Sequence, residues 1–224
     1  MTEKLKNKIN DEQLKIRAIS DEKITVKLTN NYAFQKIFKN TKIVKGFPMA
    51  LLDLKEYEIK KIEITDPFTL GENDEEKEGI PPCIHVGILN FNQMISPNYY
   101  HKFSLMDEKT KEIYSRKFQF HMLELKKLKY AKEKQQRKPL YQWAKLIAAQ
   151  TWEELEQGSK GNKYMERALE EMIKISQDEM ERYLYLRAEM AESDRVSQIQ
   201  SAKRIGRKEG KKEGEILKLI ANNV

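Results

Sequence analysis

The chain of 224 residues is long enough for one domain of ordinary size plus an extension. It carries 42 Lys and Arg against 35 Asp and Glu, and its net charge of +7 permits binding to phosphate groups without proving it. The single cysteine, Cys83, excludes an internal disulfide, and we expect it to be a small core residue in a protein of the reducing cytoplasm. The charged N-terminus and the lack of an apolar run of membrane length argue against a secretory signal and a membrane partner.

Short helices are predicted at the start of the organised part of the chain. Residues 1–27 are polar and weakly periodic, which indicates a loose arm or a short helix. Thr29 or Asn30 can cap the helix that follows, because apolar residues then repeat at positions i, i+3 and i+4. These apolar residues are Phe34, Ile37 and Phe38. A second short helical pattern covers residues 44–54.

A strand and an acidic loop are expected next. Ile62 and Ile64 flank a glutamate within residues 57–65, and this alternation predicts a strand with one buried face. The loop at residues 66–79 is bounded by Pro and Gly. Its carboxylates are numerous enough to hold a divalent ion loosely, but a solvated loop is the preferred interpretation because metal binding needs fixed geometry. The carboxylates concerned are Asp74, Glu75, Glu76 and Glu78.

Three further strands are predicted. The apolar run 84–91 has strand length and no polar face, so we expect a central strand that is buried on both faces. Residues 100–106 and 117–125 are predicted as two more strands, joined through a turn at 107–110. Each strand carries one histidine, and the three lack the close spacing of a zinc site, so we interpret them as ordinary sheet residues. They are His85, His101 and His121.

From residue 126 onward the apolar residues repeat with a helical period. Short helices are predicted around Trp143, around Trp152 and over residues 164–175. Residues 178–221 are rich in Glu, Arg, Lys, Met and Leu and contain no Pro, which predicts one long helix or two. The order of elements therefore predicts an α/β core, with α+β as the other option, followed by a helical C-terminal half.

Several segments in this order resemble the Rpn family of recombination-promoting nucleases and transposases. The first is similar to the family's opening helix, with Asn31 where the family usually has Asp and Gln35 where it often has Lys. The next resembles the approach to the first catalytic strand, and the last two resemble late strands of the core. The similar segments are residues 28–38, 62–80, 83–91 and 116–128.

The resemblance implies a nuclease of the PD-(D/E)xK type, in which an Asp on one strand and a Glu-x-Gln or Glu-x-Lys pair on the next hold Mg²⁺. Such hard oxygen ligands let the metal activate water for attack on a phosphodiester. In this chain Ile80 runs straight into Pro81, and no such pair follows between Ile80 and Phe91. We infer an internal deletion at this junction and assign no catalytic residue and no metal ligand. The expected fold is a mixed sheet core that lacks central strands.

Basic residues after the last predicted strand are candidates for contact with nucleic acid. The run contains one tyrosine and one acid, Glu133, and it fits either salt-sensitive binding to a phosphate backbone or a solvated surface. The family resemblance favours DNA. The candidate residues are Lys126, Lys127, Lys129, Lys132, Lys134, Arg137 and Lys138. Glu124, at the end of the preceding strand, is expected to have a surface or capping role.

Glycines recur at every fourth position of the charged tail, at 206, 210 and 214. This spacing lets two helices approach closely, but each interior glycine costs a helix about 1 kcal/mol. A frayed, charged helix is therefore preferred over self-association or DNA contact. The cations available for such contact are Arg204, Arg207, Lys208, Lys211 and Lys212.

The sequence thus predicts an N-terminal arm (1–27), a truncated nuclease-like core (28–128) and a helical region with a charged, glycine-containing tail (129–224). The resemblance implies a Mg²⁺-dependent DNA endonuclease that promotes recombination, here impaired because its catalytic strands are absent. The alternative is a non-catalytic module that binds DNA or pairs with an intact relative or a second copy. A third hypothesis is a decaying gene product that has no selected function.

Overall fold

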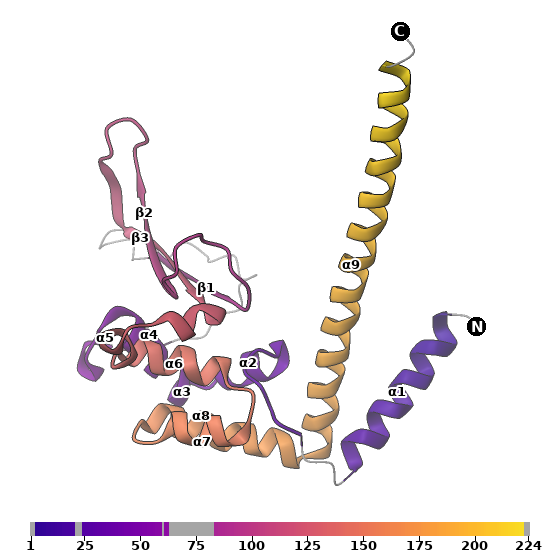
Figure 1. Ribbon diagram of the computed structural model, residues 1–224. Coiled ribbons are helices and arrows are strands. Elements are labelled where there is room, and N and C mark those ends of the chain that lie inside the picture. The colour runs from indigo at the N-terminus through magenta and orange to yellow at the C-terminus, as the bar shows by residue number, and fades with distance from the viewer. Residues whose placement is uncertain (1–2, 21–23, 60, 63–82, 222–224) are drawn as a thin grey trace, which may run out of the picture. The chain divides into compact units, whose positions relative to one another are not determined.

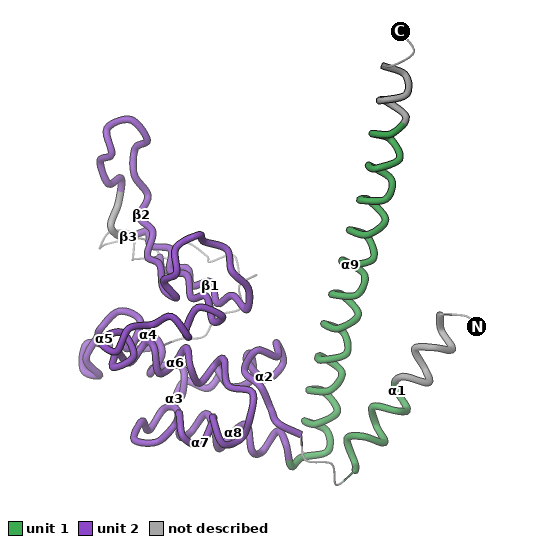
Figure 2. The backbone as a smooth tube through the Cα atoms, in the orientation of Figure 1, with its two compact units in different colours: residues 1–22, 177–224 green, residues 23–176 purple. Residues whose placement is uncertain are grey.

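The computed structural model describes residues 3–20, 24–59, 61–62 and 83–221. Contacts between residues divide the chain into two compact units (Figures 1 and 2), which are residues 1–22 with 177–224 and residues 23–176. The second unit combines a sheet with short helices, and the fold is mixed α/β as the sequence predicts. The three-part division of the chain expected from the sequence stays a prediction.

The sheet of the second unit has three described strands in the order β1-β3-β2 (Figure 1). These are β1 (Cys83–Leu89), β2 (Tyr100–Met106) and β3 (Ile113–Glu124). β1 pairs with β3 in parallel and β2 pairs with β3 antiparallel, so that Phe120 of β3 lies between His85 and Phe103. The three strands predicted after the acidic loop are confirmed, and so is the position of each histidine on its own strand.

Within the described strands, the apolar run does not have the predicted central position. Among the described strands β3 is central and β1 lies at an edge, and most β1 side chains are only partly buried. An apolar run indicates that the side chains of a strand pack against apolar neighbours, but it does not indicate how many strands pair with it. Cys83 opens β1 and is exposed, so its predicted role as a core residue is wrong as well.

The predicted strand at 57–65 is wrong over its described part. Glu56–Glu58 forms a turn of 3-10 helix, and Ile59, Lys61 and Ile62 belong to no strand. The alternation on which the prediction rested is short, and local turn formation prevails there. The end of this segment, the acidic loop and the Ile80–Pro81 junction lie outside the described residues.

The short helices of the second unit follow the predicted pattern. Asn30 caps α2, because its side-chain Oδ1 accepts hydrogen bonds from the backbone amides of Tyr32 and Ala33 at 3.0 and 3.3 Å. The helices are α2 (Asn31–Phe38), α3 (Thr41–Val44), α4 (Gly46–Leu52), α5 (Glu133–Gln136), α6 (Pro139–Ala148), α7 (Trp152–Ser159) and α8 (Lys163–Gln177). The 3-10 helix Leu125–Tyr130 links β3 to α5.

Trp143 of α6 lies at the centre of the helical layer. Its side chain is fully buried, and its ring centroid lies 5.9 Å from those of both Phe38 and Phe47. Gly46 brings α4 so close that a Cβ added there would lie 2.8 Å from Trp143 Cζ2 and 2.6 Å from Tyr164 Cβ. Aromatic rings and a glycine therefore fix the contact between α4, α6 and α8.

The first unit pairs the N-terminal helix α1 (Glu3–Ile19) with the long helix α9 (Glu179–Ala221). The Tyr183 hydroxyl donates a hydrogen bond to Asp11, and Arg182 Nη2 donates one to the Arg17 carbonyl at 3.3 Å. The N-terminal arm is therefore a helix rather than a loose segment. The C-terminal region forms one continuous helix rather than two. Within the described residues, none of the helices combines the length and apolarity needed to cross a membrane.

Candidate nucleic-acid interface

Six of the seven cations predicted to contact nucleic acid have exposed side chains. They lie on the 3-10 helix after β3, on α5 and on the segment that leads into α6. They are Lys126, Lys129, Lys132, Lys134, Arg137 and Lys138. We call this set the basic segment. Its cations stand on short helices that follow directly from the central strand, and the sheet therefore fixes where the segment begins.

The basic segment keeps most of its charge available to solvent. The one acid within it, Glu133, has an oxygen 3.9 Å from Arg137 Nη2, and both side chains are more than four-fifths exposed, so this pair is weak. The ammonium of Lys129 lies 5.0 Å from the ring centroid of Tyr130, which is itself 59% exposed. An exposed aromatic ring among cations is typical of surfaces that bind nucleic acid.

Lys127 does not belong to this surface, although the sequence places it among the candidates. Its side chain is only 4% exposed, and its ammonium donates hydrogen bonds to three acceptors. These are Glu124 Oε2 at 2.7 Å, the Met94 carbonyl at 2.5 Å and the Ser96 carbonyl at 2.7 Å. Because an ammonium has three protons, all of its donors are used inside the protein.

Glu124 completes this buried pair, and a surface role for it is wrong. The carboxylate is fully buried, and Oε1 accepts hydrogen bonds from the backbone amides of Gln93 and Met94. Oε2 accepts the bond from Lys127, and His101 Nε2 lies 3.4 Å from it. Glu124 and Lys127 together hold the loop between β1 and β2 against the end of β3.

Glu124-Leu125-Lys126 has the Glu-x-Lys spacing of a nuclease strand, a feature that sequence reasoning missed by treating Glu124 as a lone acid. The geometry of Glu124 and Lys126 does not favour metal binding. Both oxygens of Glu124 are occupied by protein donors, while Lys126 is exposed. A ligand to a divalent cation needs an oxygen free to coordinate it.

The pKa of Glu124 is lowered from its ordinary value of 4.5. Burial alone would raise the pKa, but the hydrogen bonds from Lys127, Gln93 and Met94 outweigh burial because they stabilise the charged form. In the unfolded chain the carboxyl group takes up its proton at a higher pH than in the folded protein. The contribution of this group to stability is therefore present above pH 4.5 and is lost as the pH falls through the lowered pKa.

We expect this effect to appear in urea unfolding measured between pH 6 and pH 3. As the pH is lowered, the free energy of unfolding of the wild type should decrease more steeply than that of Glu124→Gln, which has no titrating group at this position. The other carboxylates are common to both proteins, so the difference between the two curves reports on Glu124. Parallel curves would contradict the role assigned to its hydrogen bonds.

The other two histidines also have structural contacts. His121 is buried, its Nδ1 lies 2.8 Å from the Tyr100 hydroxyl, and its Nε2 lies 3.1 Å from Gln119 Oε1. Burial, and secondarily the charge of Lys102, lower the pKa of His121, which favours the neutral ring. His85 stacks on Phe120 with ring centroids 5.0 Å apart.

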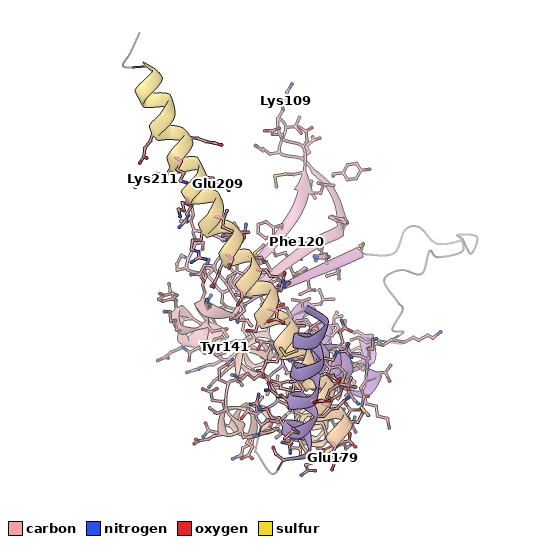
Figure 3. All side chains as sticks on the ribbon, turned by 90° about the vertical axis from the view of Figure 1, so that its right-hand side faces the viewer. Lys109, Phe120, Tyr141, Glu179, Glu209 and Lys211 are labelled. Carbon is pink, nitrogen blue, oxygen red and sulfur yellow. The ribbon has the colours of Figure 1, made fainter. Side chains whose placement is uncertain are left out.

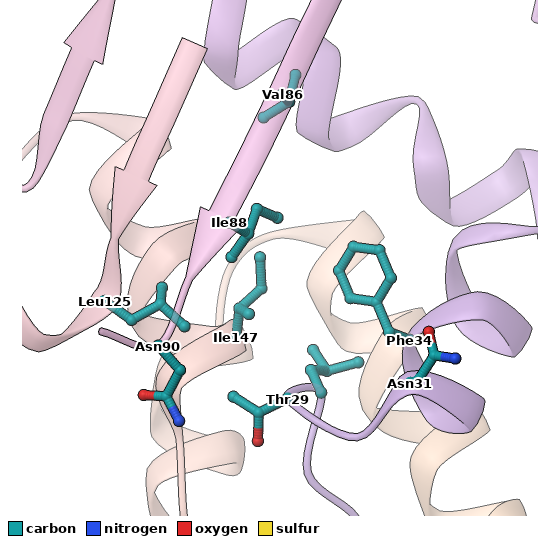
Figure 4. A pocket seen from close by; sticks show the side chains of 9 residues that line it. Thr29, Asn31, Phe34, Val86, Ile88, Asn90, Leu125 and Ile147 are labelled. Carbon is teal, nitrogen blue, oxygen red and sulfur yellow. The ribbon is translucent and has the colours of Figure 1, made fainter. Parts of the chain in front are cut away.

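An open cleft of about 310 Å³ lies between β1, α2 and α6 (Figure 4). Val86 and Ile88 of β1 line it opposite Phe34, and Asn31 and Asn90 are among its polar lining residues. None of the described residues that line the cleft ionises. Within the described part of the chain, the cleft therefore offers shape and apolar surface, but no group for acid–base catalysis or for a metal ion.

No group of three or more His, Cys, Asp or Glu side chains within the described residues could hold a metal ion. The described part of the chain therefore does not fit the Mg²⁺ site of a PD-(D/E)xK nuclease. The acidic loop that offered the other candidate ligands lies outside the described residues.

These observations define a mixed α/β protein whose central strand runs into an exposed basic segment. Comparison with protein families gives the more specific assignment. The chain belongs to the PD-(D/E)XK nuclease family of transposases, whose family model matches residues 75–202. The match includes the sheet, the basic segment, α6 to α8 and the first part of α9. No curated protein and no solved structure matches the chain.

Proposed function

We propose that this protein binds DNA through the basic segment and cleaves it weakly or not at all. The observation that carries the proposal is the exposure of six cations in a family of DNA-acting nucleases and transposases. Cations placed in this way bind phosphate oxygens without reading the base sequence. The protein would then retain the DNA-binding surface of an intact Mg²⁺-dependent endonuclease, and would act in the cytoplasm.

The lack of cleavage rests on the residues available for chemistry. Between Ile80 and Phe91 the sequence has neither the Asp nor the Glu-x-Gln pair implied by the family, and the oxygens of Glu124 are already bonded. Without ligands of fixed geometry a divalent ion is not held where it can activate water. A role in recombination would then depend on an intact relative that supplies the cleavage.

We expect duplex binding to weaken when four cations of the basic segment are replaced. The variant is Lys126→Gln, Lys129→Gln, Lys134→Gln and Lys138→Gln. The slope of log K against log salt should become shallower by about 0.9 for each phosphate that the variant no longer neutralises. Fluorescence anisotropy of a labelled duplex at several salt concentrations measures this slope. The matched control replaces four other exposed lysines of the same unit, Lys39, Lys42, Lys145 and Lys160, and thus makes the same change in net charge.

Equal slopes for the variant and its control would mean that net charge, rather than the basic segment, determines binding. A parallel assay of supercoiled plasmid with and without Mg²⁺ tests cleavage. Metal-dependent nicking by the wild type would overturn the proposed loss of activity. If the wild type does not bind DNA, the alternative of a protein-interaction module that pairs with an intact relative or with a second copy takes precedence.

A further inference from the structure

The second half of α9 carries an exposed cluster of positive charge. Every residue from 191 to 213 is exposed, and this stretch extends beyond residue 202, where the family match ends. Six cations lie within ten residues, among which Glu209 is the one acid. They are Lys203, Arg204, Arg207, Lys208, Lys211 and Lys212.

These cations gather on one side of the helix. Their positions follow the series i, i+1, i+4, i+5, i+8 and i+9, and at about 100° per residue this series covers about half of the helix circumference. Glu209 and Glu213 fall on the opposite side, together with Gly206 and Gly210, around which a Cβ would meet nothing within 4 Å. Glu209 and Lys211 mark this stretch in Figure 3. We call the cationic side the basic face of α9.

Helices with mixed charge often neutralise their cations through pairs three or four residues apart. Earlier in the same helix Arg195 does so, with Nη2 2.7 Å from Glu192 Oε1. Within the described side chains no ion pair involves a cation of the basic face. One acid, Glu215, follows the last of these cations on the same side of the helix. As far as the described side chains show, six cations are therefore available without the loss of an existing ion pair.

We propose that the basic face of α9 is a second binding site for the phosphate backbone of duplex DNA. Residues 203–212 extend for about 13 Å along the helix axis, a length over which duplex DNA carries about eight negative charges. Six cations on the helix therefore correspond to about eight phosphate charges over the same length. This site deepens the proposed function and rests on it, since DNA is the partner in both cases. It lies in the other compact unit, and the family match does not include it.

The test compares three variants with the wild type on a labelled duplex. The α9 variant carries Arg204→Gln, Arg207→Gln, Lys208→Gln and Lys211→Gln. It is measured beside the basic-segment variant and the lysine control described above, because all three remove four positive charges. Glutamine has about the same helix propensity as lysine and arginine, so circular dichroism should show unchanged helix content.

We expect the α9 variant to lower the salt slope by about 0.9 for each phosphate left without a cation, and therefore by up to about 3.6. If it behaves like the lysine control while the basic-segment variant binds weakly, the basic face is not a DNA site and the proposed function stands. If the wild type itself does not bind duplex DNA, both proposals fail. Weakened binding of single-stranded RNA with unchanged binding of duplex DNA would overturn the choice of partner.

Discussion

Replacing Lys127 by methionine is expected to lower the free energy of unfolding by about 3–5 kcal/mol. Methionine fills a similar volume but leaves the buried carboxylate of Glu124 without its counter-charge. It also leaves the carbonyls of Met94 and Ser96 without the donor that lies 2.5 and 2.7 Å away. A buried charge that loses its partner costs far more than a surface ion pair contributes.

The adjacent residue provides the control for this variant. Lys126 is exposed, so Lys126→Met should change the free energy of unfolding by less than about 0.5 kcal/mol. Urea unfolding of both variants, followed by circular dichroism, gives the comparison. If the two lysines tolerate methionine equally, Lys127 does not anchor the loop between β1 and β2. In the Lys127→Met protein the loss of stability at low pH that Glu124 introduces should be smaller, because Lys127 no longer lowers the pKa of that carboxyl group.

These adjacent lysines show how far the sequence could predict the site. A run of basic residues predicts a charged surface, and that holds for six of the seven candidates. The sequence does not record that Glu124 ends a strand inside the protein, so that a residue three positions later meets it across a 3-10 turn. In such a turn residues i and i+3 lie on the same side, which is why Lys127 turns inward and Lys126 outward.

The fold was predictable where the signal is local. Asn30 caps α2 as expected, because capping depends on a side chain and amides two or three residues away. The order of strands was not predictable, because pairing depends on residues far apart in the chain. The apolar composition of β1 therefore suggested a central strand, although β3 occupies the centre of the described sheet. Cys83 was misjudged for the same reason, since its exposure follows from its place at the start of β1.

Family resemblance and geometry supply different parts of the functional argument. The resemblance directs attention to DNA and to the residues between Ile80 and Phe91, where the catalytic pair is missing. The geometry then indicates a structural rather than a catalytic role for Glu124, because both oxygens of its carboxylate accept hydrogen bonds inside the protein. The proposal that the chain binds DNA without cleaving it therefore rests on both sources together.

Gly46→Ala is expected to destabilise the protein by about 1–3 kcal/mol, although alanine favours helices more than glycine does. The added Cβ would lie 2.6 Å from Tyr164 Cβ and 2.8 Å from Trp143 Cζ2, distances at which the neighbours must move. Neither can move easily. Trp143 is fully buried, and the hydroxyl of Tyr164 donates a hydrogen bond to Glu56 at 2.9 Å. The strain therefore outweighs the gain in helix propensity.

Gly158→Ala is the matched control in the same unit, because its Cβ would meet Leu146 Cδ1 at 3.7 Å, an ordinary van der Waals contact. Alanine inside α7 should then raise the free energy of unfolding by up to about 0.5–1 kcal/mol. Urea unfolding monitored by tryptophan fluorescence compares the two, since Trp143 lies beside Gly46. Opposite signs for two identical substitutions would show that the close approach of α4 to α6 and α8 determines the result. If Gly46→Ala were neutral, α4 would be free to shift away from Trp143, and the helical layer beneath the sheet would be less tightly fixed than the contacts of Gly46 indicate.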